Sequence, residues 1–474
     1  MLQSPAQLVS TMTAPSLLVE LNLAANQPLL ALSGAPVCDV LIYRIQFQTV
    51  GGANEPTTAS GALMVPSGFG SGCTGARPIL LYAHGTSTDR SFTMTDLGNA
   101  EALALAALFA SQGYIVVAPN YAGYDTSTLA YHPYLIAEQQ SKDMSDALKA
   151  ARTALPLASA TLTSDNGQLF VAGYSQGGYV AMATQRAMEA AGMTVTAASP
   201  MSGPYALAAF ADAVFYGEVN GGAPISTTLL LTAYQAAYGN IYASPGNVFE
   251  PRYAAGIGSL LPTGLTRSEL YAQGLLPQYA LFSATPPAAQ YADITPPMTP
   301  ANLAEVFAAG FGAGNLILNS YRLSYLTDAQ ANPDGGFPTV TTGLTAPSPQ
   351  LPWRQALQRN DLRNWVPVAP VQLCGGDVDP VVFWLNTQLL QDYWAGHAPA
   401  SASIGVLDLE APVSTSDAYT DLKQGFQAAK TLVAADAVLQ GATDGGIAAV
   451  AEAYHATLVA PFCFAAAKTF FSRY

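Results

Sequence analysis

Charged side chains are scarce in this sequence. Only 10% of its 474 residues are Asp, Glu, Lys or Arg, against about 25% in a typical soluble domain, and half are apolar. A chain this apolar can bury a large core, which excludes a disordered or solvated tail. With 17 basic and 31 acidic residues, the net charge is −14. Because such a surface repels phosphate groups, neither nucleic acids nor anionic membranes are expected partners.

Long apolar runs are also missing. The longest apolar helical segment, residues 102–110, has about half the ~18 residues that a membrane span requires, so no integral membrane segment is expected. The chain opens on Met1-Leu-Gln-Ser-Pro, without the basic segment and apolar run of a signal peptide. Two interpretations remain: a cytosolic protein, or an exported protein whose signal peptide has been removed.

The sequence has only four cysteines, and none are in Cys-x-x-Cys spacing, which argues against a zinc site. Three disulfide pairings are possible, and Cys38–Cys73 with Cys374–Cys463 joins neighbours in the layout expected below. Disulfides persist in oxidising compartments, so this pairing predicts a secreted or periplasmic protein. Four buried, reduced thiols in a cytosolic protein are the alternative. The low lysine content and the Ser, Thr, Gly and Ala content favour export.

Short apolar segments alternate with helical patterns along the chain. An alternating run at 40–50, a Gly-Gly turn and a second run at 57–65 predict an antiparallel start to a sheet. Buried strands are then expected at 78–83, 114–118, 169–172, 195–198 and 371–374, with helices at 99–112, 137–152 and 178–191. This alternation is typical of an α/β fold with a mainly parallel sheet.

The alternation stops near Pro204 and resumes near Pro367. Residues 205–365 are too long for a loop inside a compact domain and read as helices broken by Pro-Gly loops. We therefore expect an inserted helical cap at 205–365, between two core segments at 1–204 and 366–474. The second core segment is expected to hold a helix at 384–394, a strand at 404–409 and a final helix at 460–471.

One motif predicts a catalytic residue. The strand at 169–172 runs directly into Gly173-Tyr174-Ser175-Gln176-Gly177, and a helical pattern follows. Gly-x-Ser-x-Gly between a strand and a helix predicts a sharp, strained turn that exposes the Ser175 hydroxyl as a nucleophile. The helix N-terminus and the N–H of Gln176 would then face an oxyanion. A glycine-rich turn that merely closes a strand–helix unit is the alternative.

A serine nucleophile needs a base and an orienting acid. The sequence has four histidines, and in α/β hydrolases the triad runs in the order Ser, Asp or Glu, His, which excludes His84 and His132. We prefer His455, expected in a late loop, to His397, which looks like a helix cap. For the acid, Asp379 matches the Asp-x-x-Val turn that usually follows this strand, while Asp377 is expected to cap the turn.

The oxyanion needs a second donor from the loop after the strand at 78–83. His84-Gly85-Thr86 lies there, and the N–H of Thr86 is the candidate, with His84 expected to hold the loop through side-chain hydrogen bonds. The segment 119–124, after the next strand, is expected either to border the pocket or to be a glycine turn with packed tyrosines. The reaction requires no metal and no organic cofactor.

Five motifs together resemble the secretory lipase/esterase family, which groups bacterial exported α/β hydrolases with the lipase A type of yeasts. They are Tyr82-Ala-His-Gly-Thr86, Tyr131-His-Pro-Tyr134, Gly173-Tyr-Ser-Gln-Gly177, Cys374-Gly-Gly-Asp-Val-Asp-Pro-Val-Val-Phe383 and Tyr454-His with Pro461-Phe-Cys463. The resemblance spans most of the chain from about Cys38 onward. It implies an α/β-hydrolase fold, a helical cap inserted after the sixth strand, and carboxylic-ester hydrolysis by Ser175, Asp379 and His455.

The predicted function is therefore a serine esterase or lipase that forms an acyl-enzyme with a small, lipid or polymeric ester. A serine peptidase on the same fold and a non-catalytic binding protein are the alternatives. Chain-length preference, movement of the cap and the oligomeric state do not follow from the sequence.

Overall fold

The computed structural model describes residues 1–70, 72–157, 162–414 and 417–474. Within them, nine strands form one sheet in the order β1-β2-β3-β5-β4-β6-β7-β8-β9. The strands are β1 (Gln7–Met12), β2 (Asp39–Val50), β3 (Pro56–Ser67), β4 (Gly75–Ala83), β5 (Ile115–Pro119), β6 (Thr163–Tyr174), β7 (Ala197–Met201), β8 (Val371–Gly375) and β9 (Ile404–Asp408).

The sheet is antiparallel at one edge and parallel elsewhere. β2 pairs antiparallel with β1 and β3, and β3 with β5, whereas β5, β4, β6, β7, β8 and β9 run parallel to one another. Every residue of β5, β7 and β8 is buried, as expected for strands covered by helices on both faces. The predicted mainly parallel α/β architecture is confirmed. Strand β1 was not predicted, because its mostly exposed residues lack an apolar pattern.

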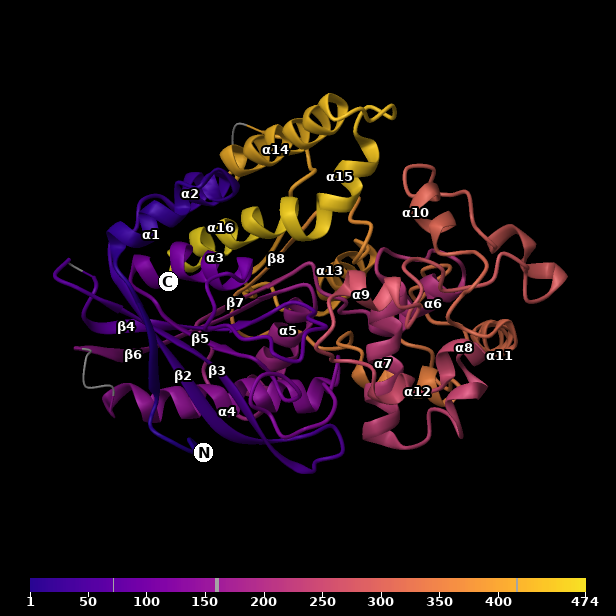
Figure 1. Cartoon of the computed structure of the whole chain (residues 1–474), viewed down its shortest axis with the longest axis horizontal. Coiled ribbons are helices and arrows are strands. Elements are labelled where there is room, and N and C mark those ends of the chain that lie inside the picture. Colours follow the sequence, from indigo (N-terminus) through magenta and orange to yellow (C-terminus); the bar gives the residue numbers. More distant parts are fainter. Residues whose placement is uncertain (71, 158–161, 415–416) are drawn as a thin grey trace.

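Helices cover both faces of the sheet (Figure 1). On one face lie α4 (Ala137–Ala154) and α5 (Gln176–Ala190), and on the other lie α3 (Ala100–Leu108) and α16 (Ala460–Phe471). Two separate apolar cores result, one on each side of the sheet. Outside α3 and α16 lie α1 (Ala14–Leu21), α2 (Gln27–Ser33), α14 (Thr420–Leu439) and α15 (Ile447–Ala453). The carboxyl ends of β4, β6 and β8 therefore meet at one edge, where a parallel sheet places its ligands.

Between β7 and β8 the chain forms a run of helices at one end of the molecule (Figure 1). They are α6 (Leu207–Phe215), α7 (Ala223–Tyr238), α8 (Pro251–Ala254), α9 (Arg267–Ala272), α10 (Ala304–Ala309), α11 (Asn319–Ala331) and α12 (Pro352–Asn360), followed by α13 (Leu385–His397) after β8. Arg354 of α12 bridges the carboxylates of Asp212 and Asp328, at 2.8 and 3.1 Å. Because all three side chains are buried, this network ties α6, α11 and α12 together.

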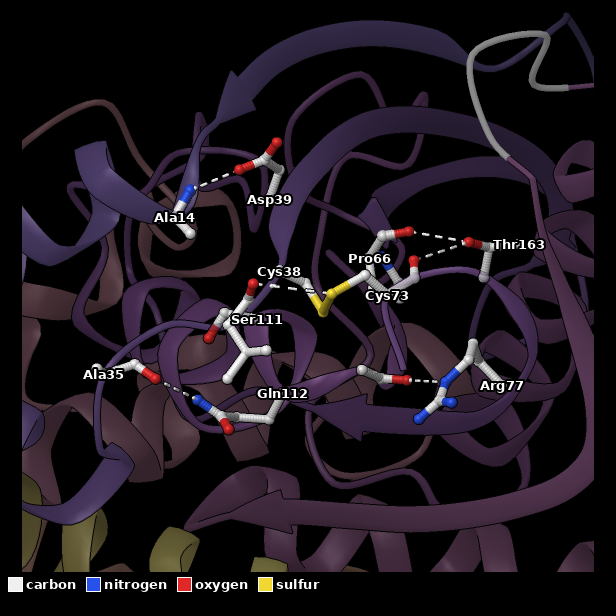
Figure 2. The surroundings of a disulfide bond; sticks show 12 residues. Ala14, Ala35, Cys38, Asp39, Pro66, Cys73, Arg77, Ser111, Gln112 and Thr163 are labelled. Atoms are coloured by element: carbon white, nitrogen blue, oxygen red, sulfur yellow. Dashed lines mark hydrogen bonds between the residues drawn. A yellow bond between two sulfur atoms is a disulfide. The ribbon is translucent and has the colours of Figure 1, made fainter. Parts of the chain in front are cut away.

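Both predicted disulfides are present, Cys38–Cys73 and Cys374–Cys463. Figure 2 shows the first, where the N–H of Cys38 donates to the carbonyl of Ser111 over 2.9 Å and Thr163 donates to the carbonyl of Pro66 over 2.9 Å. It fastens the start of β2 to the loop before β4. The second disulfide joins β8 to α16, which are separated in the chain by α13, β9, α14 and α15.

Removing the Cys374–Cys463 disulfide is expected to destabilise the protein. The bond closes a segment of 89 residues, so a Cys374→Ser, Cys463→Ser double variant frees a long loop in the unfolded chain. We expect the free energy of unfolding to fall by about 2–5 kcal/mol, with a smaller loss for Cys38→Ser, Cys73→Ser, whose loop is shorter. Urea denaturation of both variants measures this. Unchanged stability of both variants, together with four titratable thiols in denatured, unreduced wild-type protein, would contradict the pairing.

One helical stretch among the described residues, Ile447–Phe471, is long and apolar enough by composition to cross a membrane. The expectation that no stretch reaches this length overlooked it, because Glu452, His455 and Lys468 interrupt the apolar run. In the fold, 44% of its most apolar window is buried, and Cys463 within it is bonded to β8. Core helices of globular proteins pass the same test of length and composition, so the stretch is weak evidence for a span.

Candidate active site

Ser175 lies in a sharp turn between β6 and α5. Its backbone has φ 60° and ψ −121°, a left-handed conformation that non-glycine residues rarely adopt. The two flanking glycines permit the turn: a Cβ at Gly177 would lie 1.9 Å from the carbonyl oxygen of Ala83, and one at Gly173 would lie 2.1 Å from the carbonyl oxygen of Gly177. The strained turn and the need for glycine on both sides of it are thus as the motif predicted.

Three of the predicted side chains form a continuous hydrogen-bonded chain. The Nε2 atom of His455 lies 2.8 Å from the hydroxyl of Ser175, and its Nδ1 atom lies 2.7 Å from Oδ2 of Asp379. Asp379 is 2% exposed and His455 is 8% exposed, so the pair lies in a medium that strengthens its electrostatic attraction. A serine, an imidazole and a carboxylate in this order can transfer a proton from the hydroxyl to the ring.

The carboxylate of Asp379 is fixed by the turn in which it lies. Its Oδ1 atom accepts hydrogen bonds from the N–H groups of Val381 and Val382, at 2.9 and 3.1 Å, which leaves Oδ2 for the imidazole. Asp377 was expected to cap this turn, but its side chain is exposed and Asp379 itself is the cap. Asp379 is thus part of the site, whereas Asp377, two positions earlier, faces solvent.

His455 lies in a helical segment. A π-helical turn, Tyr454–Val459, carries it between α15 and α16, so the expected late loop is wrong. Tyr174 of β6 donates a hydrogen bond to the His455 carbonyl, and the two rings are 5.1 Å apart. π-Helical turns are rare and recur at functional sites, because the extra residue in the turn changes where a side chain points.

The N–H groups of Gln176 and Thr86 are candidates to bind an oxyanion. Gln176 is the first residue of α5, where the helix dipole favours negative charge. Within the described part of the chain, neither N–H donates a hydrogen bond to another residue, whereas that of Ser175 donates to the Met201 carbonyl over 3.0 Å. Both N–H groups are therefore available to a ligand.

His84 holds the loop that contains Thr86, as expected. Its Nδ1 atom lies 2.6 Å from the Gly85 carbonyl, and its Nε2 atom lies 3.2 Å from the Asn120 carbonyl. Burial lowers the pKa of His84 to about 4 and outweighs the two carbonyls, which raise it. The ring is thus neutral at pH 7 and has one N–H to donate, which the shorter contact assigns to Nδ1 and the Gly85 carbonyl. Tyr121, in the segment 119–124, stacks on it at 4.1 Å and donates to its carbonyl, so that segment packs under the loop.

His132 has a role that sequence reasoning missed. Its Nδ1 atom lies 2.9 Å from the Ala122 carbonyl, and its Nε2 atom lies 2.7 Å from the side-chain nitrogen of Gln176. Burial lowers its pKa to about 3, so the neutral ring donates through Nδ1 and accepts through Nε2. His132 therefore fixes the side chain of the residue that follows the nucleophile. The Tyr-His-Pro-Tyr motif marked His132 in the sequence. It gave no indication of the contact with Gln176, because the two residues are 44 positions apart.

The helical segment between β7 and β8 reaches the same loop. Thr263 pairs with it twice: its N–H donates to the Thr88 carbonyl over 2.8 Å, and its carbonyl accepts from Arg90 over 2.7 Å. Arg267 of α9 donates to the Thr86 carbonyl over 3.5 Å. The remaining histidine, His397, is in the last turn of α13, where it contacts the Tyr393 carbonyl, so it lies outside this cluster as expected.

The fold and these contacts define a class. A mainly parallel sheet whose β6–Ser175–α5 turn presents a serine next to an imidazole and a carboxylate is the architecture of an α/β hydrolase. Among the described residues, no group of three or more His, Cys, Asp or Glu side chains is arranged to hold a metal ion.

Comparisons with known proteins agree with this class. The prolyl oligopeptidase family model matches residues 102–222. The rice cell wall degrading esterase LipA from Xanthomonas oryzae is 26% identical, with a TM-score of 0.66 over 93% of this chain and 98% of that one. A candidate hydrolase from Legionella pneumophila is 17% identical, with a TM-score of 0.65 over 100% and 98% of the two chains. Lipase A from Candida antarctica is 11% identical, with a TM-score of 0.49 over 86% and 77%. No curated protein matches the chain.

The match to the Xanthomonas esterase covers almost all of both chains. It confirms the predicted resemblance to a lipase/esterase family, and the predicted α/β-hydrolase fold is confirmed with it. This chain is a hydrolase.

Proposed function

We propose that the protein is a serine hydrolase of carboxylic esters, with Ser175 as nucleophile, His455 as base and Asp379 as orienting acid. The observation that carries the proposal is the chain of contacts from the Ser175 hydroxyl to His455 at 2.8 Å and on to Asp379 at 2.7 Å. The resemblance to a 26% identical esterase supports esters as the substrate class.

In the first half of the reaction, Ser175 attacks the ester carbonyl while His455 takes the hydroxyl proton on Nε2. Asp379 holds the ring through Nδ1 and stabilises its positive charge. The negative charge that forms on the carbonyl oxygen is stabilised by the N–H groups of Gln176 and Thr86. When the intermediate collapses, the C–O bond to the alcohol breaks and His455 returns the proton to the departing oxygen.

In the second half, water replaces the alcohol. His455 takes a proton from the water as its oxygen attacks the acyl-enzyme, and the same two N–H groups stabilise the second oxyanion. The bond to Ser175 then breaks, the proton returns to its hydroxyl, and a carboxylic acid leaves. Each proton accepted by the ring is given back, so no co-reactant besides water is needed.

The setting of the site supports two further parts of the proposal. The helical insert donates to the Thr86 carbonyl through Arg267, so we propose that residues 205–365 act as a cap over the substrate. Two disulfides are suited to an oxidising compartment, so we propose a secreted or periplasmic protein. The Xanthomonas esterase is described as degrading rice cell walls, which makes polymeric esters as relevant a substrate class as lipids.

A peptidase is the second candidate, because the prolyl oligopeptidase family model matches residues 102–222. This match includes Ser175 and α5 but not Asp379 or His455. It therefore covers the part of the fold that esterases and peptidases share, and it carries no information on the leaving group.

A substrate panel separates the two candidates. We expect kcat/KM for short-chain p-nitrophenyl esters to exceed that for matched prolyl or aminoacyl p-nitroanilides by at least about 1,000-fold, a difference of about 4 kcal/mol in activation free energy. The ester members of the panel are a butyrate, a long-chain acylglycerol and an acetylated or feruloylated polysaccharide. Faster cleavage of the anilides would replace the ester proposal with the peptidase.

A further inference from the structure

A carboxylate beside the site takes no part in the proposed reaction. Glu101 lies in the first turn of α3, where Asn99 already caps the helix by accepting from the Glu101 N–H over 2.9 Å. Its side chain reaches back to the loop after β4 and accepts the N–H of Gly85 at 3.0 and 3.1 Å on its two oxygens. Tyr82 donates to one of these oxygens over 2.5 Å. Glu101 therefore connects the start of α3 to the loop that contains Thr86.

The Gly85 residue is held on both sides. Glu101 accepts its N–H, and the His84 ring lies 2.6 Å from its carbonyl oxygen. In a trans peptide the carbonyl and the following N–H point in opposite directions. With the Gly85 carbonyl turned toward the His84 ring, the Thr86 N–H is turned away from it. These two anchors thus fix the direction of a donor that has no acceptor among the described residues.

The electrostatic surroundings of Glu101 are unfavourable for its charge. Burial raises its pKa to about 7, although the hydrogen bonds from Tyr82 and Gly85 and the charge of protonated His455 lower it. The other titratable groups that face it are Tyr121, after β5, and Tyr174, on β6, and both are neutral at pH 7. Glu101 forms no salt bridge within the described residues. Because burial disfavours the charge of Glu101 and Asn99 already caps α3, we expect this carboxylate to have another role.

We propose that Glu101 is a positioning residue, which fixes the Gly85 backbone so that the Thr86 N–H faces the oxyanion. This inference rests on the proposed function, because it assigns a task within that reaction. It also explains why Gly85 does not supply the donor itself: its N–H is already bound to Glu101.

The variant Glu101→Gln tests the proposal. It keeps the shape of the side chain but offers one acceptor oxygen to two donors, so the grip on Gly85 weakens. Losing a whole oxyanion donor costs about 100–1,000-fold in rate, so we expect kcat to fall about 10- to 100-fold when that donor is only misdirected. KM should change little, because the hydrogen bond strengthens as charge develops in the transition state.

The pH profile separates positioning from a merely structural role. In the wild type, kcat should rise with pH through about 7 as Glu101 loses its proton. The variant cannot ionise at this position and lacks this rise. The ratio of wild-type to Glu101→Gln kcat should therefore be about 10 to 100 at pH 8.5 and approach about 1 below pH 6. A structural defect would give the same ratio at every pH.

Two other variants make the test robust. Glu138→Gln is the matched control, because Glu138 is also in the first turn of its helix, α4, but is exposed; its kcat should equal that of the wild type. Tyr82→Phe keeps the carboxylate and removes a hydrogen bond that lowers its pKa, so the Glu101-dependent rise should move to higher pH. This variant gives a result even if Glu101→Gln does not fold.

The outcomes distinguish the two proposals. If the wild type hydrolyses no ester and a fluorophosphonate does not label Ser175, the proposed function fails. If the wild type is active and labelled, but Glu101→Gln has unchanged kcat or a ratio independent of pH, only the role of Glu101 is overturned. A pH-dependent ratio that Glu138→Gln lacks supports it.

Discussion

The Ser175→Ala variant should lose nearly all hydrolytic activity and remain folded. Removing the hydroxyl removes the only atom that forms the acyl-enzyme, and in serine hydrolases this typically lowers kcat about a million-fold. The turn itself does not depend on the hydroxyl, because the flanking glycines and the Ser175 backbone bond to Met201 are unchanged. Hydrolysis of p-nitrophenyl butyrate by equal amounts of both proteins measures the loss.

Thermal unfolding serves as the control for this variant. Its midpoint should match the wild type within a few degrees, as should that of Ser324→Ala, a change on the exposed face of α11 that should also leave kcat intact. Retention of more than about a hundredth of the activity by Ser175→Ala would assign the chemistry to another residue.

Asp379→Asn should have the second largest effect. The carboxylate accepts from Nδ1 of His455 at 2.7 Å, while its other oxygen is held by two backbone N–H groups. Because those N–H groups require an oxygen, an asparagine would turn its NH₂ group toward the imidazole and favour the wrong tautomer. A loss of about 10,000-fold in kcat is expected, with KM nearly unchanged.

Asp377→Asn provides a matched control two residues away. It makes the same chemical change in the same turn, but Asp377 is exposed and has no contact with His455. Its kcat should stay within about threefold of the wild type. If Asp377→Asn were as damaged as Asp379→Asn, the orienting role would belong to the turn as a whole.

The parts of this molecule that could be predicted from sequence are those that depend on local rules. Short apolar runs bounded by turn residues predicted β4, β5 and β8 to within three residues, whereas β6 begins six residues before its predicted start and β7 lies two to three residues further along the chain. The strained turn at Ser175 followed from Gly173 and Gly177 together with their place between a strand and a helix. The disulfide pairing followed from segments that were expected to be neighbours in the fold. The catalytic roles of Ser175, Asp379 and His455 stay predictions, although the structure brings their side chains together.

What sequence missed depends on contacts between distant segments. The π-helical turn at His455 has no local pattern that distinguishes it from a loop or a helix end. His132 was set aside because it precedes Ser175 in the chain, yet packing of its ring places it on the Gln176 side chain. Glu101 has the sequence pattern of an ordinary acidic residue in a first helical turn. Its contact with Gly85 forms only because the chain folds back and places the start of α3 beside the loop after β4. Exposed β1 lacks the apolar alternation that identifies a strand.

The role of Ser175 as nucleophile is tested most directly by finding which residue an active-site probe modifies. Folded protein is treated with a fluorophosphonate, digested, and analysed by mass spectrometry for the phosphonylated peptide. We expect stoichiometric modification of Ser175 alone, slowed strongly in Asp379→Asn and prevented by prior heat denaturation. An unmodified Ser175 in protein that hydrolyses esters, or modification of a different serine, would contradict it.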